Sequence, residues 1–355
     1  MKRGRARLID LKGRGLDALL VSDISSIRYL SGFTGSSAFV VITQDRRFFL
    51  TDTRYATQAR GELFKGFQIK IYRKNGLEEV IRLLEAIQAE AVGFEGDCLS
   101  YDSFKKLDGA LKGVKLASAP ELVRGLRKIK DADEVGRVRE SIRILDLGFK
   151  EAQRCIRAGA VEKEVAFSIE TAFIRHGADC PAFDTIIASG FRSALPHGKA
   201  SGKKIKNGEF VVVDMGARLD GYNSDETRTY CVGRAGPRQK KIYQTVLDAQ
   251  QRAIDSIRPG VAASAVDAAA RGHIKKAGYG RFFGHALGHG VGIDVHEAPT
   301  LSPFSKDVLE AGMVVTVEPG VYIPGEGGVR IEDMILVTEG GAEVLTKTPK
   351  GLVCL

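Results

Sequence analysis

The chain has 355 residues and a formal net charge of +9, because 53 basic side chains outnumber 44 acidic ones. A chain of this length favours two domains, each large enough to bury its own core. The basic residues are dispersed and the chain has no Trp. Because a basic stripe interleaved with exposed aromatic residues is missing, we expect no nucleic-acid partner.

The cysteine pattern and the hydropathy of the chain indicate the cellular compartment in which we expect the protein. The cysteines form no Cys-x-x-Cys pair and are widely spaced, at Cys98, Cys155, Cys180, Cys231 and Cys354. This pattern indicates neither a disulfide framework nor a zinc knuckle, and it fits a reducing cytoplasm. Charged residues interrupt positions 8–20, so the basic N-terminus lacks the apolar stretch of a signal peptide. No run approaches transmembrane length, and we expect a cytoplasmic protein without a membrane partner.

The first third of the chain alternates helix-like stretches with short β runs. The β runs are expected at residues 17–21, 38–43, 46–51, 67–72 and 91–94. This alternation predicts a small α/β domain over residues 1–125. A densely charged segment at residues 127–134 follows, and we place the domain boundary near Gly125.

The remainder, residues 126–355, begins with a long helical pattern. It runs from Asp131 towards Arg157, with Ile142, Leu145 and Phe149 on one apolar face. Further helices are expected over residues 162–176, 237–257 and 263–277, with strand-like runs between and after them. The order helices, strands, helices, strands suggests two similar α+β halves around a shared site, although no sequence repeat is visible.

Metal-ligand residue types recur beside strand-like runs in the last third of the chain, at Asp214, Asp225, His289, Glu318 and Glu332. Four carboxylates and one imidazole supply enough donors for two divalent cations about 3.5–4 Å apart, with a position left for water. Taken alone, Asp214 fits a turn former better. However, a hairpin turning at Gly221 could bring Asp214 and Asp225 to one end of a sheet.

The surroundings of four residues support this hypothesis. Glu318 and Glu332 lie in apolar strand patterns, where an unpaired buried carboxylate would be costly and a metal ion removes that cost. Arg330 lies two residues before Glu332 and would point to the same strand face, where it could pair with a ligating carboxylate. A surface salt bridge is the alternative. Glycines on both sides of His289 permit close approach of a ligand, although they would also suit a tight turn.

Other kinds of active site fit the sequence poorly. The glycine spacing of phosphate-binding loops is absent, and Thr300 stands where a zincin motif starting at His296 needs its second histidine. No Gly-x-Ser-x-Gly elbow occurs, and no cysteine adjoins a histidine. Histidines that do not bind metal, such as His197, His285 and His296, can hydrogen-bond a substrate carbonyl or a tetrahedral intermediate.

Together these motifs resemble the metallopeptidases of the pita-bread fold, family M24, and within them the aminopeptidase P and prolidase group. The resemblance covers nearly the whole chain. It runs through residues 29–36, 50–55, 183–190, 195–198, 285–290, 295–297, 318–320 and 329–333, and through the Asp214 and Asp225 motifs. It implies a creatinase/prolidase-like α/β domain over residues 1–125 and a pita-bread (creatinase/aminopeptidase-like) catalytic domain over residues 126–355.

The resemblance also implies a role for each candidate residue. Asp214 would hold one metal ion, His289 and Glu318 the other, and Asp225 and Glu332 would bridge the pair. Glu318 would also move the proton. His197, His285 and His296 would contact the substrate or the intermediate. Arg330 would hold a metal ligand in position without binding the metal itself.

The sequence therefore favours a dinuclear-metal Xaa-Pro aminopeptidase that uses a metal-activated water on proline-containing peptides, and we expect a homodimer. The oxygen-rich ligand set favours Mn2+, with Co2+, Zn2+ or Fe2+ as alternatives. An Xaa-Pro dipeptidase (prolidase) is the nearest alternative. Several dipeptidases of this family carry an arginine shortly after the His-Glu pair, where this chain has Thr300 and Leu301. A metal-free binding or scaffold protein on the same fold is the alternative of another class.

Overall fold

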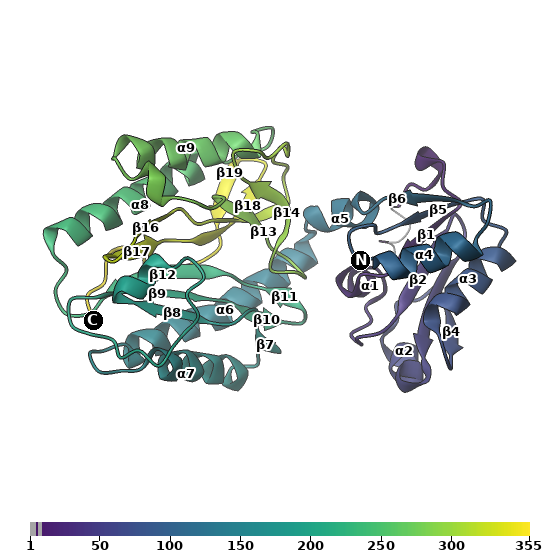
Figure 1. Ribbon diagram of the computed structural model, residues 1–355, viewed down its shortest axis with the longest axis horizontal. Coiled ribbons are helices and arrows are strands. Elements are labelled where there is room, and N and C mark those ends of the chain that lie inside the picture. The colour runs from purple at the N-terminus through teal and green to yellow at the C-terminus, as the bar shows by residue number, and fades with distance from the viewer. Residues whose placement is uncertain (1–4, 6–8) are drawn as a thin grey trace. The chain divides into compact units, whose positions relative to one another are not determined.

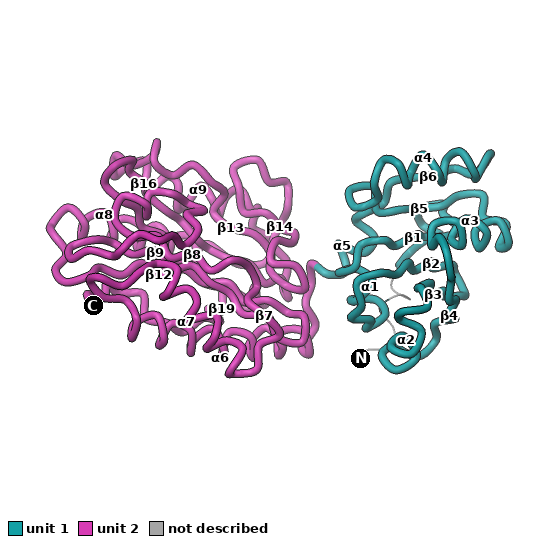
Figure 2. Tube along the Cα trace, turned by 60° about the horizontal axis from the view of Figure 1, so that its bottom comes forward, with its two compact units in different colours: residues 1–127 teal, residues 128–355 magenta. Residues whose placement is uncertain are grey.

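The computed structural model describes residue 5 and residues 9–355, so the basic stretch at residues 1–7 lies mostly outside the described residues. The chain divides into two compact units, Met1–Arg127 and Lys128–Leu355 (Figure 2). Within the described ranges, no helix is both long and apolar enough to cross a membrane.

The first unit is a twisted sheet with helices packed against it (Figure 1). Its strands are β1 (Ala18–Val21), β2 (Phe39–Thr43), β3 (Arg47–Asp52), β4 (Gln68–Tyr72), β5 (Ala91–Phe94) and β6 (Lys115–Ser118). Its helices are α1 (Ile24–Ser31), α2 (Ala56–Glu62), α3 (Gly76–Ala86), α4 (Tyr101–Ala110) and α5 (Glu121–Lys128). The strand order is β4-β3-β2-β1-β5-β6, with β1 antiparallel to β2 and parallel to β5. Apolar side chains of α3 and α4 pack on β1, β2, β3 and β5, so these two helices cover one face.

The second unit carries two pairs of helices on opposite sides of its strands (Figure 1). The helices are α6 (Ala132–Cys155), α7 (Glu162–Arg175), α8 (Pro237–Ser256) and α9 (Ala263–Lys276). The strands are β7 (Cys180–Pro181), β8 (Ile186–Ser189), β9 (Phe210–Met215), β10 (Ala217–Leu219), β11 (Tyr222–Asn223), β12 (Glu226–Cys231), β13 (Gly288–Gly290), β14 (Glu297–Leu301), β15 (Val314–Val317), β16 (Gly320–Ile323), β17 (Gly327–Arg330), β18 (Asp333–Thr338) and β19 (Gly341–Val344).

The strands of this unit form separate sheets whose orders are β12-β9-β8, β11-β10-β7, β14-β13-β15-β18-β19 and β16-β17. Helices α6 and α7 pack on the sheet that contains β9, through residues such as Leu145, Phe149 and Val213. Helices α8 and α9 pack on the sheet that contains β15, through residues such as Val246 and Val317. Each half therefore has its own core.

Local sequence explains where the helices begin. Asp131 caps α6: its side chain accepts from the backbone of Glu134, and the Glu134 carboxylate accepts from the backbone of Asp131. This reciprocal capping satisfies two backbone donors that a helix start leaves free. Pro237 occupies the first position of α8, where no backbone N–H is needed.

The predicted order of helices and strands is confirmed, with every expected helix and β run present within a few residues. Strand β6 was not predicted. Its two end residues are exposed, its two central residues are half-buried, and it includes one large apolar side chain, Leu116, so it carries little β signal. The strand forms because Ala91–Phe94 offers a parallel edge to it.

Candidate metal centre

Two aspartates reach the site from one hairpin. Asp214 lies near the end of β9, and Asp225 directly precedes β12, which pairs antiparallel with β9. The short strands β10 and β11 connect them through a turn at Asp220 and Gly221, both of which adopt positive φ angles. The turn predicted at Gly221 is therefore present, and it places both carboxylates at one end of the sheet.

The histidine comes from the facing sheet. His289 is the middle residue of β13, between two glycines. A Cβ on Gly288 would lie 2.0 Å from the carbonyl oxygen of Thr316, and one on Gly290 would lie 2.3 Å from that of Ala298. Only glycine fits at these positions. The tight packing of the two flanking backbones, rather than a loose turn, fixes His289 in its strand.

The two glutamates lie at breaks between strands, not within continuous strands as the apolar pattern suggested. Glu318 separates β15 from β16, and Glu332 separates β17 from β18. The break at Glu332 occurs where its backbone N–H donates to the carbonyl oxygen of Thr227 on β12, 3.0 Å away. The Thr227 hydroxyl also donates to the Glu332 carboxylate over 2.6 Å. A strand pattern alone cannot reveal such a crossing between sheets.

The structure brings these side chains together. Ligand atoms of Asp225, His289 and Glu332 lie within 4.8 Å of one another. His289 Nε2 lies 3.3 Å from Glu318 Oε1 and 3.7 Å from Asp225 Oδ2. Asp214 joins the group through Arg330, whose Nη2 donates to Asp214 Oδ2 over 2.6 Å. Arg330 also donates to the Thr227 hydroxyl, so it lies beside the carboxylates as predicted.

Burial makes this cluster electrostatically unfavourable. Burial and the neighbouring Asp214 raise the pKa of Asp225 well above its usual range, and burial and the neighbouring Asp225 do the same to the pKa of Glu332. Burial also raises the pKa of Asp214, although Arg330 opposes that shift. Burial alone would lower the pKa of His289, but its hydrogen bond to Glu318 and the nearby carboxylates raise it to about 9.

The donor set fits a divalent cation. Asp214 Oδ1 is buried and has no hydrogen-bond partner among the described residues. Three buried carboxylates and the half-buried carboxylate of Glu318 face one guanidinium and one imidazole, so acidic groups outnumber basic ones. A buried oxygen without a donor and a surplus of like charges both favour a bound cation, which would supply the missing partner. Oxygen donors and one imidazole suit Mg2+, Mn2+ and related hard or intermediate ions.

The three histidines proposed to contact the substrate differ in their burial and in their neighbours. His285 is half-buried, and its Nε2 lies 3.0 Å from the hydroxyl of Tyr322. Burial lowers its pKa, which favours a neutral imidazole. The exposed ring of His296 lies 4.3 Å from that of His289, centroid to centroid. Burial and the neighbouring His289 lower the pKa of His296. His197 is exposed in the turn after the 3-10 helix Gly190–Ala194.

Sequence reasoning missed three polar residues that hold the site. Thr227 hydrogen-bonds both Glu332 and Arg330. The Thr316 hydroxyl accepts from the backbone of His289 and lies 3.2 Å from Glu318 Oε1. The Tyr322 hydroxyl accepts from Arg330 Nη1 over 2.8 Å. Alternation along β12 could have identified Thr227, because Asp225 and Thr227 lie two residues apart on one strand face.

A second cluster of buried charges lies on the opposite face of the same strands. Arg228 Nη2 donates to Asp333 Oδ1 over 2.7 Å and to the carbonyl oxygen of Thr348 over 2.6 Å. Lys350 Nζ lies 2.9 Å from Asp333 Oδ2. Glu226 Oε1 lies 2.6 Å from Arg228 Nη2 but accepts no hydrogen bond there, so this contact is an ion pair of poor angle. Burial raises the pKa of Glu226 to about 8. We call these residues the rear cluster.

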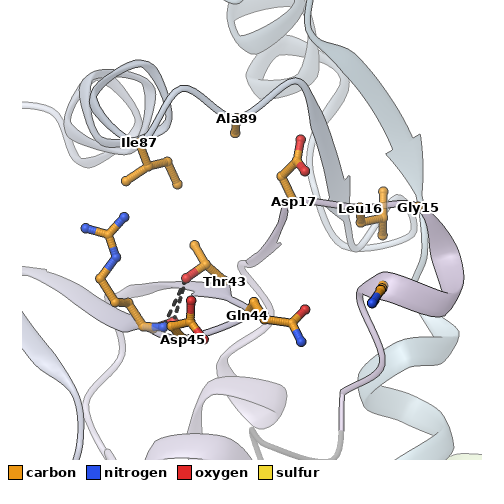
Figure 3. Close-up of a pocket in the computed structure, with 10 residues that line it drawn as sticks. Gly15, Leu16, Asp17, Thr43, Gln44, Asp45, Ile87 and Ala89 are labelled. Carbon is orange, nitrogen blue, oxygen red and sulfur yellow. Dashed lines mark hydrogen bonds between the residues drawn. The ribbon is translucent and has the colours of Figure 1, made fainter.

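The first unit has a hollow of its own, of about 470 Å³. Its lining includes Asp17, Thr43 and Gln44 (Figure 3). The Asp17 carboxylate already accepts from the backbone of Glu90 and Ala91. None of the candidate metal ligands lines this hollow, and all of them lie in the second unit.

Comparison with known proteins identifies what these two units resemble. Residues 136–339 match the model of metallopeptidase family M24, and residues 6–129 match the creatinase/prolidase N-terminal domain. An Xaa-Pro dipeptidase of Pyrococcus horikoshii is 40% identical over 95% of both chains. The structure of an Xaa-Pro dipeptidase from Bacillus anthracis has a TM-score of 0.95 at 42% identity, over 100% of this chain and 99% of that one. An X-Pro aminopeptidase structure from Thermotoga maritima has a TM-score of 0.91 at 36% identity, over 99% of both chains.

Proposed function

The chain belongs to metallopeptidase family M24 and has the predicted fold, a creatinase-type N-terminal domain followed by a pita-bread catalytic domain, and on this premise we propose that it is an Xaa-Pro dipeptidase. It is a metallo-exopeptidase by its family and relatives. The proposal concerns its substrate, a dipeptide with proline in the second position, and the residues that act on it.

The similarity to dipeptidases carries this proposal. Proteins named Xaa-Pro dipeptidase match at 40% and 42% identity over nearly their whole length, whereas the aminopeptidase structure matches at 36%. The sequence argument for an aminopeptidase depended on a missing arginine after His296 and Glu297. In the structure that stretch is strand β14, with Thr300 opposite His289. The comparisons therefore favour the dipeptidase alternative over the aminopeptidase reading.

We propose that Asp214, Asp225, His289, Glu318 and Glu332 hold two divalent ions, Mn2+ by donor chemistry. Bound there, such ions polarise the scissile carbonyl and lower the pKa of a water molecule towards neutrality. This proposal is supported by the short distances among these side chains and by the surplus of buried negative charge.

The chain's own residues would position the substrate and move the proton. Glu318 would accept a proton from the attacking water and deliver it to the proline nitrogen as the peptide bond breaks. Its Oε1 lies 3.3 Å from His289 Nε2 and 3.2 Å from the Thr316 hydroxyl, which fix its orientation. His197, His285 and His296 would hydrogen-bond the scissile carbonyl, the intermediate and the proline end of the substrate. Arg330 would hold Asp214 in place.

A side-by-side assay tests the proposed substrate. We expect kcat/KM for an Xaa-Pro dipeptide to exceed that for the matching Xaa-Pro-Xaa tripeptide by at least about tenfold, which equals about 1.4 kcal/mol of transition-state stabilisation. The matched control is the Xaa-Ala dipeptide, which tests the requirement for proline. Equal or faster cleavage of the tripeptide would restore the aminopeptidase reading. Equal cleavage of Xaa-Pro and Xaa-Ala would overturn both readings.

Metal analysis separates a peptidase from a scaffold on the same fold. A purified protein that binds no divalent cation, even when Mn2+ is supplied, would contradict the enzyme assignment.

A homodimer and a cytoplasmic location stay predictions from the sequence, and sedimentation analysis tests the first of them.

A further inference from the structure

The C-terminal residues add to the free edge of the strand that follows Asp225. Strand β12 lies at one end of its sheet. Its last residue, Cys231, donates its backbone N–H to Val353 and accepts from the backbone of Leu355, at 3.0 and 2.8 Å. These two bonds form a parallel bridge that places Cys231 directly opposite Cys354. The end of the chain is therefore held in register by backbone hydrogen bonds.

The same register brings two thiols together. Cys231 is fully buried and its thiol donates to the carbonyl oxygen of Val232 over 3.9 Å, whereas Cys354 is exposed. Neighbouring strands lie about 4.7–4.9 Å apart. This spacing falls within the Cα separation of about 4.4–6.8 Å that a disulfide spans. Burial and the neighbouring Cys354 raise the pKa of Cys231 to about 11, so the exposed thiol is the one available to an oxidant.

We propose that Cys231 and Cys354 are a redox modification site, at which a hydroperoxide converts the two thiols into a reversible disulfide. The site goes beyond the peptidase activity and does not depend on it. All five cysteines are free thiols in the structure, so Cys231 and Cys354 are available for this reaction.

The chemistry balances in two steps. The Cys354 thiolate attacks the distal oxygen of the hydroperoxide, the O–O bond breaks, and a sulfenic acid forms while the alkoxide or hydroxide takes up a proton. The sulfur of Cys231 then attacks the sulfur of Cys354. The S–S bond forms, the S–O bond breaks, and the departing hydroxide takes the thiol proton and leaves as water. The two thiols together lose two electrons, which the peroxide accepts. An alkyl hydroperoxide is thereby reduced to an alcohol and water, and hydrogen peroxide to two waters.

The disulfide would lock a segment that the rear cluster needs. Thr348 and Lys350 lie just before Cys354 and contact Arg228 and Asp333. The Thr346 hydroxyl also donates to Asp333 over 2.7 Å. A covalent link between residues 231 and 354 would close a long loop in the unfolded chain and so stabilise the folded protein. We therefore expect oxidation to fasten the C-terminal segment onto β12.

Peroxide treatment of the full-length protein, followed by alkylation of remaining thiols and peptide mass mapping without reductant, tests the site. We expect a linked peptide pair containing Cys231 and Cys354, two hydrogen masses below the sum of the free peptides. Dithiothreitol should abolish it. The pair should form in Cys98→Ser, which removes another exposed cysteine, and should not form in Cys354→Ser.

Thermal unfolding supplies a second measurement. We expect the oxidised protein to unfold at least about 2–4 °C above the reduced protein, the shift that a modest stabilisation produces in a chain of this size, and Cys354→Ser to show no such shift. Further oxidation of Cys354 while Cys231 stays reduced, or a cross-link between two chains through Cys354, would overturn the proposal. A linked pair without any rise in Tm would overturn the locking of the C-terminal segment.

Discussion

Adjacent carboxylates on the same strands meet opposite environments. Asp225 and Glu332 face the candidate metal centre, whereas their neighbours Glu226 and Asp333 face the rear cluster. On the rear side, Arg228 and Lys350 approach these carboxylates closely, and backbone carbonyls accept the remaining Arg228 donors. The pKa of Asp333 is lowered there despite its burial, mainly by Arg228 and Lys350. Burial raises the pKa of Glu226 to about 8, so this side chain is mostly neutral at pH 7 and leaves no surplus of negative charge.

We call the side of Asp225 and Glu332 that faces the candidate metal centre the front face. Its buried carboxylates have no comparable number of basic partners. Arg330 is committed to Asp214, Thr227 and Tyr322, and the pKa values of Asp225 and Glu332 are raised well above normal. The difference teaches how to read buried charges. A cluster that is balanced internally supports the fold, whereas one that stays unbalanced is prepared for a cation from outside. The predictions below test this distinction.

The largest effect should come from the rear cluster. Arg228→Met should lower the free energy of unfolding by about 3–5 kcal/mol, the usual cost of removing one partner from a buried ion pair. Urea denaturation of the chelated protein measures it. A change below about 1 kcal/mol would mean that this cluster does not support the fold as we infer. Lys199→Met, at an exposed ion pair with Asp184, is the control, and it should change stability little.

On the front face, substitution of a substrate-binding histidine should have a different effect from substitution of a metal ligand. His197→Ala and His296→Ala should each keep the metal ions but raise the activation barrier by about 2.7–4 kcal/mol, because each removes one hydrogen-bond donor to the reacting groups. Paired measurements of metal content and kcat/KM distinguish the roles. If either variant loses its metal ions, the division between ligands and substrate histidines is wrong.

In the metal-free state, Asp225→Asn should change the free energy of unfolding by less than Arg228→Met does, and in the opposite direction. Asp225→Asn removes a carboxylate whose pKa is raised by burial and by Asp214. Since the folded metal-free protein disfavours that charge at neutral pH, the variant should be more stable than the wild type. Denaturation of chelated protein at pH 7 measures it. Marked destabilisation would show that the front carboxylate is structural.

Much of the fold followed from local sequence. The capping pair at Asp131 and Glu134 and the apolar face of α6 are set by neighbouring residues, so the helix could be predicted. Strand β6 depends on a distant edge and could not. In the same way, the turn at Gly221 indicated how Asp214 and Asp225 meet, whereas the breaks at Glu318 and Glu332 depend on hydrogen bonds to other strands and escaped prediction.

The motifs identified the candidate ligands, which the structure brings together, but they did not identify the residues that support these ligands. Each candidate ligand lies in a short recognisable segment, but Tyr322 contacts His285 and Thr316 contacts the backbone of His289, both of which lie far away along the chain. The rear cluster was missed for a related reason. Arg228, Asp333 and Lys350 look like ordinary charged residues in sequence, and only the packing of strands shows that Arg228 and Asp333 are buried together and that Lys350 reaches them.

Metal titration of three chelated proteins tests the central distinction most directly. The wild type should bind up to two Mn2+ ions per chain by calorimetry. Glu226→Gln changes the adjacent rear residue, whose pKa of about 8 already favours the neutral form at pH 7, and should bind as the wild type does. Asp225→Asn should bind far more weakly and lose activity. Unchanged binding in Asp225→Asn, or equal loss in both variants, would contradict the account.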